Sequence, residues 1–395
     1  MPSTCEPAAA CRSSRRRSVI YLDANATTPL HPAVLQAMMP ALEGVFANPS
    51  SVHKPGQDAR ALVDRAREQC ARALGCSERE IVFTSGGTES DLLAVRGLAP
   101  EGSRVVVSSV EHPAVFGACE GREVVRIGVD GDGLLDVAAL ANALPGAALC
   151  SIMAANNETG VLSPLEEIAG LCRRNGVLLH TDAVQAAGKM PLPLEHADLI
   201  SLSAHKIGGP KGAGLLWIRN GLALRALQPG GHQERGRRGG TENVAGIVGL
   251  AEALSVAAAS LPEEAPRLAA LRDRLQAAAE GIPRSRVAGR NAPRVCNTLN
   301  VAFEGCDGET LLTALDLAGI AVSTGSACSS GTLEPSPVLL AMGHPPHLAR
   351  AAIRFSLWRG TTPAQIDEVC RVLPDVVERC RSRPDRRERW RGSAS

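Results

Sequence analysis

The sequence predicts an α/β protein, with a large domain built on a mixed, mostly parallel sheet and a smaller α+β domain. Three observations predict this class. The length of 395 residues suggests two to three domains. Residues 56–220 alternate between helical segments and short β-prone runs, which is the pattern of βαβ units with helices on both faces of a sheet. After Pro262 the pattern changes to a smaller set of helices and strands.

The large domain is expected to contain a series of short strands. The amphipathic segment 57–74 predicts a helix that ends at Gly75, and residues 81–83 predict an apolar strand that leads into a glycine-rich turn. Further β-prone runs follow, with helical stretches such as residues 164–174 between several of them. These runs cover residues 104–108, 123–129, 147–154, 177–181, 197–202 and 214–218.

The small domain is expected to combine helices with fewer strands. We assign residues 32–263 to the large domain and residues 1–31 and 264–395 to the small domain, with the boundary near residues 260–265. The predicted elements are helices over residues 265–280, 308–317 and 363–379 and strands over residues 298–303, 320–322 and 352–357, with a Ser/Gly-rich loop over residues 323–332.

Composition excludes several classes of protein. Hydrophobic residues make up 45% of the chain and charged residues 21%, which indicates a globular protein rather than a disordered one. A formal net charge of +1 gives no overall field for nucleic acid or anionic lipid, and we expect neither as a partner. The twelve cysteines lack C-x-x-C spacing, which argues against a zinc ribbon or a disulfide framework and favours a reduced, cytoplasmic chain.

The termini and the most apolar segment show no export or membrane signal. The basic residues near the N-terminus are not followed by an apolar region. Residues 244–261 are apolar but contain Glu252 and space their large apolar residues helically, so we expect a buried helix rather than a membrane span. Acidic residues interrupt the C-terminal arginines, and we expect residues 1–17 and 381–395 to be disordered, solvated tails rather than a nucleic-acid patch.

Lysine is the scarcest informative residue. The chain has four lysines, and Lys206 follows the apolar strand 197–202 at a strand end, where α/β sheets place ligands. Desolvation there would lower the pKa of its amine, as formation of an imine requires. A surface lysine that opens a loop would have the same local sequence.

Two further strand ends carry residues that suit a cofactor. Asp182 ends the predicted strand 177–181 and is followed by Gln185, and a buried carboxylate needs a cation such as a protonated ring nitrogen. An N-cap for the next helix is the alternative role for Asp182. The turn Ser85-Gly86-Gly87-Thr88-Glu89 suits an anion such as phosphate, although a tight turn also needs glycine. With Lys206, these features together predict pyridoxal 5'-phosphate.

Cys328 and Arg354 are the other candidates. Cys328 lies in a loop of small residues, where a thiol is more exposed and reactive than Cys172, which lies in an apolar helical pattern. Arg354 lies on the predicted strand 352–357 and is a candidate for binding a carboxylate with two hydrogen bonds, with a surface salt bridge as the alternative. No metal site is expected.

From Tyr21 to Pro374, the chain resembles the cysteine desulfurases of the class-V aminotransferase group. The resemblance rests on ordered blocks, and the loop around Cys328 is similar to that of the long-loop branch, which serves iron–sulfur assembly. It implies the fold type I of pyridoxal-phosphate-dependent transferases. The blocks are residues 21–29, Asn48-Pro49-Ser50-Ser51, Glu111-His112, Asn156-Asn157-Glu158-Thr159-Gly160, residues 201–206, Gly239-Gly240-Thr241-Glu242-Asn243 and Leu333-Glu334-Pro335-Ser336.

The resemblance also implies roles for individual residues. Lys206 would hold the cofactor as an aldimine, His112 would stack on its ring and assist proton transfer, and Asp182 would pair with the ring nitrogen. Asn157 and Gln185 would bond near the ring oxygen or the substrate. The phosphate would be held by Gly87, Thr88, Ser203, Ala204 and His205, with Thr241 reaching it from the other subunit of a homodimer.

The implied reaction takes sulfur from L-cysteine and releases L-alanine. Arg354 would bind the substrate carboxylate, and the thiolate of Cys328 would attack the substrate sulfur, so activity should fall at low pH as Cys328 protonates. The resulting persulfide would pass to an iron–sulfur scaffold protein, with Cys328 as a contact for cluster iron during transfer. The sequence departs from the family pattern at Asp91, His232 and Trp358, where asparagine, glycine and glycine are usual.

Three other readings stay open. The first is another enzyme of the same fold, such as a selenocysteine lyase or an aminotransferase, although Cys328 argues against a simple aminotransferase. The second is a non-catalytic sulfur-relay or scaffold-binding protein, against which Lys206 and His112 argue. The third is a cysteine hydrolase, for which no local signature supplies a base.

Overall fold

The computed structural model describes residues 19–324 and 334–381, and in these ranges the largest sheet has seven strands. Five neighbouring strands, in the order β7, β6, β5, β3 and β4, pair in parallel. Strand β8 is antiparallel to both of its neighbours, β2 and β7. The prediction of a mixed, mostly parallel sheet is therefore confirmed. In spatial order the strands are β2 (Ile81–Thr84), β8 (Gly214–Ile218), β7 (Leu199–Ser203), β6 (Leu178–Asp182), β5 (Leu149–Ser151), β3 (Arg104–Ser108) and β4 (Glu123–Ile127).

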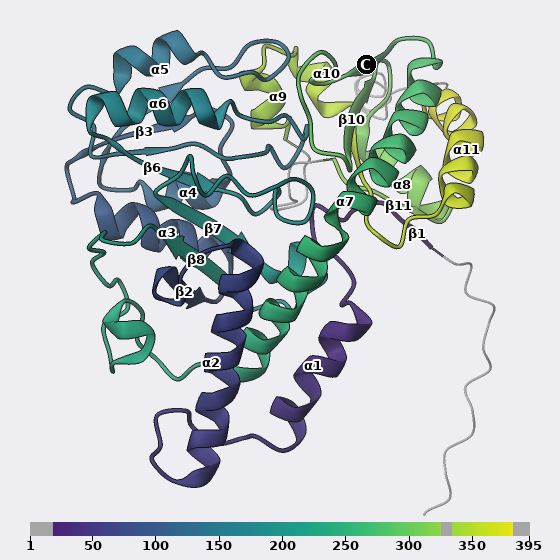
Figure 1. Cartoon of the computed structure of the whole chain (residues 1–395). Helices are drawn as coiled ribbons and strands as arrows, with labels where there is room; N and C mark the ends of the chain where they lie inside the picture. The colour runs from purple at the N-terminus through teal and green to yellow at the C-terminus, as the bar shows by residue number, and fades with distance from the viewer. Residues whose placement is uncertain (1–18, 325–333, 382–395) are drawn as a thin grey trace, which may run out of the picture.

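Both faces of this sheet are covered, because alternate residues of a strand point to opposite sides. Val106 packs with residues of α2, α6 and α7, whereas Val105 and Val107 pack with residues of α3 and α4. The helices of this part of the chain (Figure 1) are α1 (Pro32–Glu43), α2 (Lys54–Leu74), α3 (Gly87–Leu98), α4 (Pro113–Ala118), α5 (Val137–Ala143), α6 (Leu165–Asn175) and α7 (Val244–Glu280).

A second hydrophobic core forms beside an antiparallel sheet. Leu299, from the central strand of that sheet, and Phe355, from the strand beside it, are fully buried in this core together with Leu275 of α7. The strands are β12 (Ala352–Ser356), β10 (Thr298–Phe303) and β9 (Ser285–Val287), with a separate parallel pair of β1 (Ile20–Tyr21) and β11 (Ile320–Ala321). The helices are α8 (Gly308–Leu317), α9 (Pro337–Ala341), α10 (Pro346–Arg350) and α11 (Pro363–Arg381).

Helix α7 corrects the predicted start of the helix over residues 265–280. The sequence predicts that a new helix begins after Pro262, but α7 continues through Pro262 and Pro266. Its buried residues Leu250 and Leu268, which belong to the first and the second core, lie about five helical turns apart and therefore on one face. The predicted start is wrong because the change of pattern after Pro262 was taken as a helix boundary, while packing against both cores holds the helix together.

By length and composition α7 is apolar enough to cross a membrane. In the described structure it packs against α1, α2 and α11, and Leu250, Leu254 and Leu275 on it are buried. The prediction of a buried helix over residues 244–261 agrees with this packing.

The assignment of two domains stays a prediction. Arg381, expected in the C-terminal tail, ends α11 and donates to the carbonyl oxygen of Glu304 (3.0 Å); the rest of both tails lies outside the described residues.

The segment after β1 passes between the two cores. The backbone N–H of Ala24 donates to the carbonyl oxygen of Ser356 on β12 (3.1 Å). Four residues later the chain meets the end of the large sheet, where the N–H of Thr28 donates to the carbonyl oxygen of His205 (2.9 Å). Residues 22–28 therefore connect the end of β7 to β12, and we call them the crossing segment.

A buried ion pair anchors the loop that precedes α7. Arg67 on α2 donates to the Oε1 atom of Glu234 (2.6 Å), and the Oε2 atom of Glu234 accepts the backbone N–H of Phe83 on β2 (2.9 Å). Both charged side chains are buried. Glu234 has a left-handed backbone, with φ of 47°. Since such a conformation is unfavourable for a non-glycine residue, these contacts hold the loop in place.

Replacement of Arg67 by alanine is expected to destabilise the protein by about 3–5 kcal/mol, because Glu234 would stay buried without its cation. Urea denaturation followed by tryptophan fluorescence measures this free energy. The matched control is Arg72→Ala, on the same helix but 70% exposed, with an expected change within about 0.5 kcal/mol. Equal effects of the two variants would contradict the role of the ion pair.

Candidate active site

The candidate site lies where β6 and β7 end. Asp182 is the last residue of β6 and pairs in register with Ser201 of the neighbouring strand β7. The chain leaves β7 at Ser203 and enters a short 3-10 helix, Ala204–Lys206. Because parallel strands end at the same edge of a sheet, the carboxylate and the amine predicted from the sequence come to one place.

The Lys206 amine is held by the crossing segment. Its Nζ atom donates to the carbonyl oxygens of Asn25 (2.6 Å) and Ala26 (2.8 Å). Burial, followed by the positive charge of Arg354, lowers the pKa of Lys206 to about 8. The side chain therefore has the partial desolvation that the sequence suggested for an imine-forming amine.

Asp182 lies buried beside this amine. Its Oδ1 atom accepts the backbone N–H of Val184 (2.9 Å) in a turn, and in the described structure no helix follows β6 before β7, so the alternative role of Asp182 as a helix N-cap is wrong. Burial raises the pKa of Asp182, while the charges of His112 and Lys206 act to lower it. Among the residues that the structure describes, Asp182 has no salt-bridge partner, so its carboxylate can pair with a cationic group that binds beside it.

His112 faces the same site and also begins helix α4. Its Nδ1 atom accepts the backbone N–H of Ala114 (3.1 Å). Accepting this hydrogen bond requires an unprotonated Nδ1, so the neutral ring carries its proton on Nε2. Burial lowers the pKa of His112, which favours this neutral form.

The predicted anion site lies at the start of α3. Gly86 precedes the helix, which has no side-chain cap, so the first N–H groups of this twelve-residue helix are open to an anion. A Cβ atom at Gly87 would lie 2.7 Å from Cγ2 of Val184, so a larger residue there would displace the Val184 side chain. Ser203 is buried, and its Cβ atom lies 3.8 Å from that added Cβ position. The Nδ1 atom of His205 forms a hydrogen bond with the hydroxyl of Thr27 (3.1 Å).

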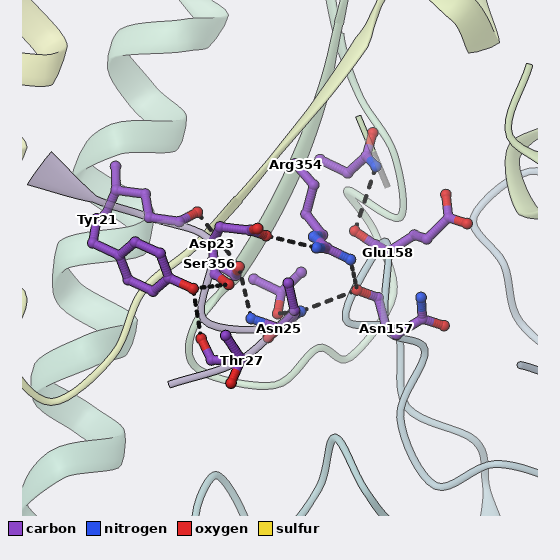
Figure 2. Close-up of polar contacts among 12 residues, drawn as sticks. Tyr21, Asp23, Asn25, Thr27, Asn157, Glu158, Arg354 and Ser356 are labelled. Atoms are coloured by element: carbon purple, nitrogen blue, oxygen red, sulfur yellow. Dashed lines mark hydrogen bonds and ion pairs between the residues drawn. The ribbon is translucent and has the colours of Figure 1, made fainter. Parts of the chain in front are cut away.

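Arg354 on β12 contacts the crossing segment at Asp23 (Figure 2). Its Nη2 atom donates to Oδ1 of Asp23 (2.7 Å), and its Nη1 atom donates to the carbonyl oxygen of Asn157 (3.1 Å). The arginine is buried, and its Nε has no hydrogen-bond acceptor among the described residues. Asp23 and Asn157 use two of the five N–H groups, so the guanidinium keeps Nη hydrogens for a further acceptor, while Nε is buried.

Asn25 is the functional residue that sequence reasoning missed. Its Nδ2 atom donates to the carbonyl oxygen of Asn157 (3.0 Å; Figure 2), and its own carbonyl oxygen accepts both Lys206 and the Nε2 atom of Gln185 (3.0 Å). Its position in the block 21–29 identified it as part of the pattern, but its contacts come from residues more than a hundred positions away. No local signal reveals such contacts.

The remaining predicted residues have different outcomes. Ala204 is buried, and Thr88 lies in the first turn of α3. Thr241 is exposed, in the loop where Arg238 donates to Glu89 of α3 (2.8 Å). Cys328 lies outside the described residues.

The three departures from the family pattern also have defined positions. Asp91 is buried on α3 near Asp182, and His232 is exposed in the loop before α7. Trp358 packs against Gly360, where a Cβ atom would lie 2.4 Å from its ring. Of the three, Asp91 therefore lies nearest to the candidate site.

The sequence and the fold of this chain are similar to those of known proteins. The family model described as Aminotransferase class-V matches residues 20–369. A cysteine desulfurase of Cereibacter sphaeroides is 50% identical over 92% of this chain and 97% of its own, and "Cysteine desulfurase IscS" of Methanosarcina thermophila is 43% identical over 93% and 94%. A solved "NIFS-LIKE PROTEIN" covers 91% of this chain and 99% of its own, at 35% identity and a TM-score of 0.85. "SspA in complex with cysteine" covers 86% and 98%, at 33% identity and a TM-score of 0.76.

The lowered pKa of Lys206 predicts its reactivity. Because the amine becomes neutral as the pH rises through about 8, its acetylation by acetic anhydride should reach half of its maximum near that pH. Mass spectrometry of each lysine peptide of the cofactor-free protein between pH 6 and 11 measures this, with Nα-acetyl-lysine in the same tube as a reference of pKa about 10.4. A midpoint for Lys206 equal to that of the reference would contradict the burial of the amine.

Proposed function

The chain belongs to the class-V aminotransferase family and is a cysteine desulfurase, and we propose that it uses pyridoxal 5'-phosphate to take sulfur from L-cysteine. The products would be L-alanine and a persulfide on Cys328. The observation that carries this proposal is the partly desolvated Lys206 amine beside the buried, unpaired carboxylate of Asp182. The solved relative named "SspA in complex with cysteine" supports cysteine as the substrate.

The residues present fit the proposed cofactor. Asp182 offers a buried carboxylate to a protonated ring nitrogen, and the open first turn of α3 offers backbone N–H groups to a phosphate. A side chain at Gly87 would collide with Val184, so the glycine leaves these N–H groups open to the phosphate. When bound, the cofactor supplies an electron sink for the bonds of the substrate's α-carbon.

The protein side chains would then bind the substrate and move protons. The Lys206 amine, once free, would take the α-proton, and the carbonyl oxygens of Asn25 and Ala26 hold it in position. His112 presents an Nε2–H group, so we assign it as a hydrogen-bond donor or acid in its neutral form. Arg354 would bind the substrate carboxylate through the donor that Asp23 and Asn157 leave unused.

Sulfur transfer would proceed by attack of the Cys328 thiolate on the substrate sulfur. A sulfur–sulfur bond forms as the carbon–sulfur bond breaks, and the electron pair left on carbon takes up a proton to give alanine. Both described flanks of the Cys328 loop end beside the site. Ser323 pairs with Arg354 through backbone hydrogen bonds, and the hydroxyl of Ser336 donates to Oε2 of Glu158 (2.5 Å).

The wider context is also part of the proposal. We propose a cytoplasmic homodimer in which exposed Thr241 reaches the phosphate of the other subunit, and a scaffold protein for iron–sulfur clusters as the sulfur acceptor. Selenocysteine lyase activity is the alternative on the same site. Comparison of turnover with L-cysteine and L-selenocysteine distinguishes the two activities.

The variant Cys328→Ala is expected to keep the yellow colour of the bound cofactor but to lose persulfide formation, because the attacking thiolate is gone. Incubation with L-cysteine, an alanine assay and mass spectrometry for an added sulfur on each thiol measure this outcome. The matched control is Cys306→Ala, which removes a half-buried thiol of the second core and should leave turnover unchanged. Unchanged sulfide release by Cys328→Ala under reducing conditions would exclude the assignment.

Replacement of Arg354 by glutamine should raise KM for L-cysteine at least about 30-fold, the effect of losing about 2 kcal/mol from a desolvated charge pair. Turnover of cysteamine, which has no carboxylate, should change much less. Steady-state rates with both compounds measure the difference, and Arg350→Gln, at an exposed arginine of α10, is the matched control. Equal losses with cysteine and cysteamine would contradict carboxylate binding by Arg354.

A further inference from the structure

We propose that Lys189 is a positioning residue that fixes the side-chain amide of Gln185 with its NH2 group turned toward the cofactor site. The inference rests on the proposed function, because the cofactor ring is the acceptor to which that NH2 group would donate. Lys189 lies one turn after Gln185 in the segment that follows β6. It is buried, and no comparison or sequence motif assigns it a role.

The contacts of Lys189 form one continuous chain. Its Nζ atom donates to Oε1 of Gln185 (2.6 Å) and to Oδ1 of Asn25 (3.1 Å). The Nε2 atom of Gln185 donates to the carbonyl oxygen of Asn25 (3.0 Å), the same oxygen that accepts the amine of Lys206 (2.6 Å). Two lysines are therefore joined through one carbonyl group and one side-chain amide.

These contacts permit only one orientation of the amide. The oxygen and nitrogen of a glutamine side chain have nearly the same shape, so hydrogen bonds decide which way the group turns. A lysine ammonium group only donates, and a backbone carbonyl only accepts. A flipped Gln185 would place its NH2 group against Lys189 and its oxygen against the carbonyl of Asn25. The contact with Asn25 would be repulsive in every case, and the contact with Lys189 would be repulsive while its amine is protonated.

The orientation leaves one donor for the site. The NH2 group of Gln185 has two hydrogens, and the carbonyl of Asn25 takes one of them. The second can donate to an acceptor such as the ring oxygen of the cofactor. Without Lys189, one of the two constraints on the amide is lost, and the flipped state would offer an oxygen to that acceptor instead.

The environment of Lys189 supports a role in positioning rather than in charge pairing. Asn25 is itself fixed, since its Oδ1 atom also accepts Nδ2 of Asn297 (3.1 Å) and its Nδ2 atom donates to Oγ1 of Thr298 (2.8 Å). In the described chain no carboxylate forms a salt bridge with Lys189. Burial lowers the pKa of Lys189 to about 7, and the neutral amine still has N–H groups to donate.

The first test observes the amide without the cofactor. In protein labelled with 15N-glutamine, the NH2 signal of Gln185, assigned by its loss in Gln185→Leu, should be protected from solvent exchange. Lys189→Met, which keeps a similar shape without a donor, should reduce that protection at least about tenfold. Lys211→Met, at an exposed lysine, is the matched control and should leave the signal unchanged. Unchanged protection in Lys189→Met would overturn the proposal.

The second test uses the loaded enzyme and a double-mutant cycle. Loss of a donor to the ring oxygen should move the pH midpoint of the cofactor's visible absorption band by roughly 0.5–1 pH unit in Lys189→Met, in the same direction as in Gln185→Leu. The double variant should move no further than Gln185→Leu alone. A shift of equal size in both backgrounds would mean that Lys189 acts as a charge, which would overturn the proposal.

A third variant separates the donor from the charge and serves if Lys189→Met does not fold. Lys189→Gln keeps an N–H donor but has no charge, so it should move the midpoint less than about a third as far as Gln185→Leu. An equal shift would overturn the proposal. Failure of the wild-type protein to bind pyridoxal 5'-phosphate would exclude the proposed function, while the exchange measurement would still decide the role of Lys189.

Discussion

The crossing segment, residues 22–28, is the constraint on which the candidate site depends. Asn25 is 2% exposed, and its backbone and side chain together bind Lys206, Gln185, Asn157 and Ser356. These residues come from the large sheet, from the turn after β5 and from β12. A backbone carbonyl can hold an amine without neutralising it, which keeps Lys206 in position while leaving its nitrogen free to react.

Burial in the site shifts the pKa values of both the basic and the acidic side chains. Burial lowers the pKa of Lys206 and Lys189, and it raises the pKa of Asp182 and Asp91. His180, beneath Asp182 on β6, is neutral because burial lowers its pKa to about 3, and it hydrogen-bonds Ser151 (2.8 Å) and Ser201 (2.9 Å). The polar residues of the sheet next to Asp182 are therefore neutral, and the proposed cofactor would bring a cationic group to this carboxylate.

Local pattern predicted much of the fold and of the site. The strands at residues 104–108 and 298–303 and the helix at residues 308–317 agree with the structure at both ends, because turns and polar residues bound each apolar run. Lys206 and Asp182 were predicted because strand ends can be located from sequence. Short helices such as α9 were missed, since five residues carry too little periodicity. The roles of Asn25 and Lys189 were missed because they arise from contacts between distant segments.

Helix α7 has a consequence for how the two halves of the molecule move. At 37 residues it is about 55 Å long, and its buried residues from Gly246 to Ala279 serve first one core and then the other. Pro262 and Pro266 lie between these two sets of residues, and each lacks the N–H group that would continue the helical hydrogen bonding. A change in the angle between the two halves would therefore bend the helix near these two prolines.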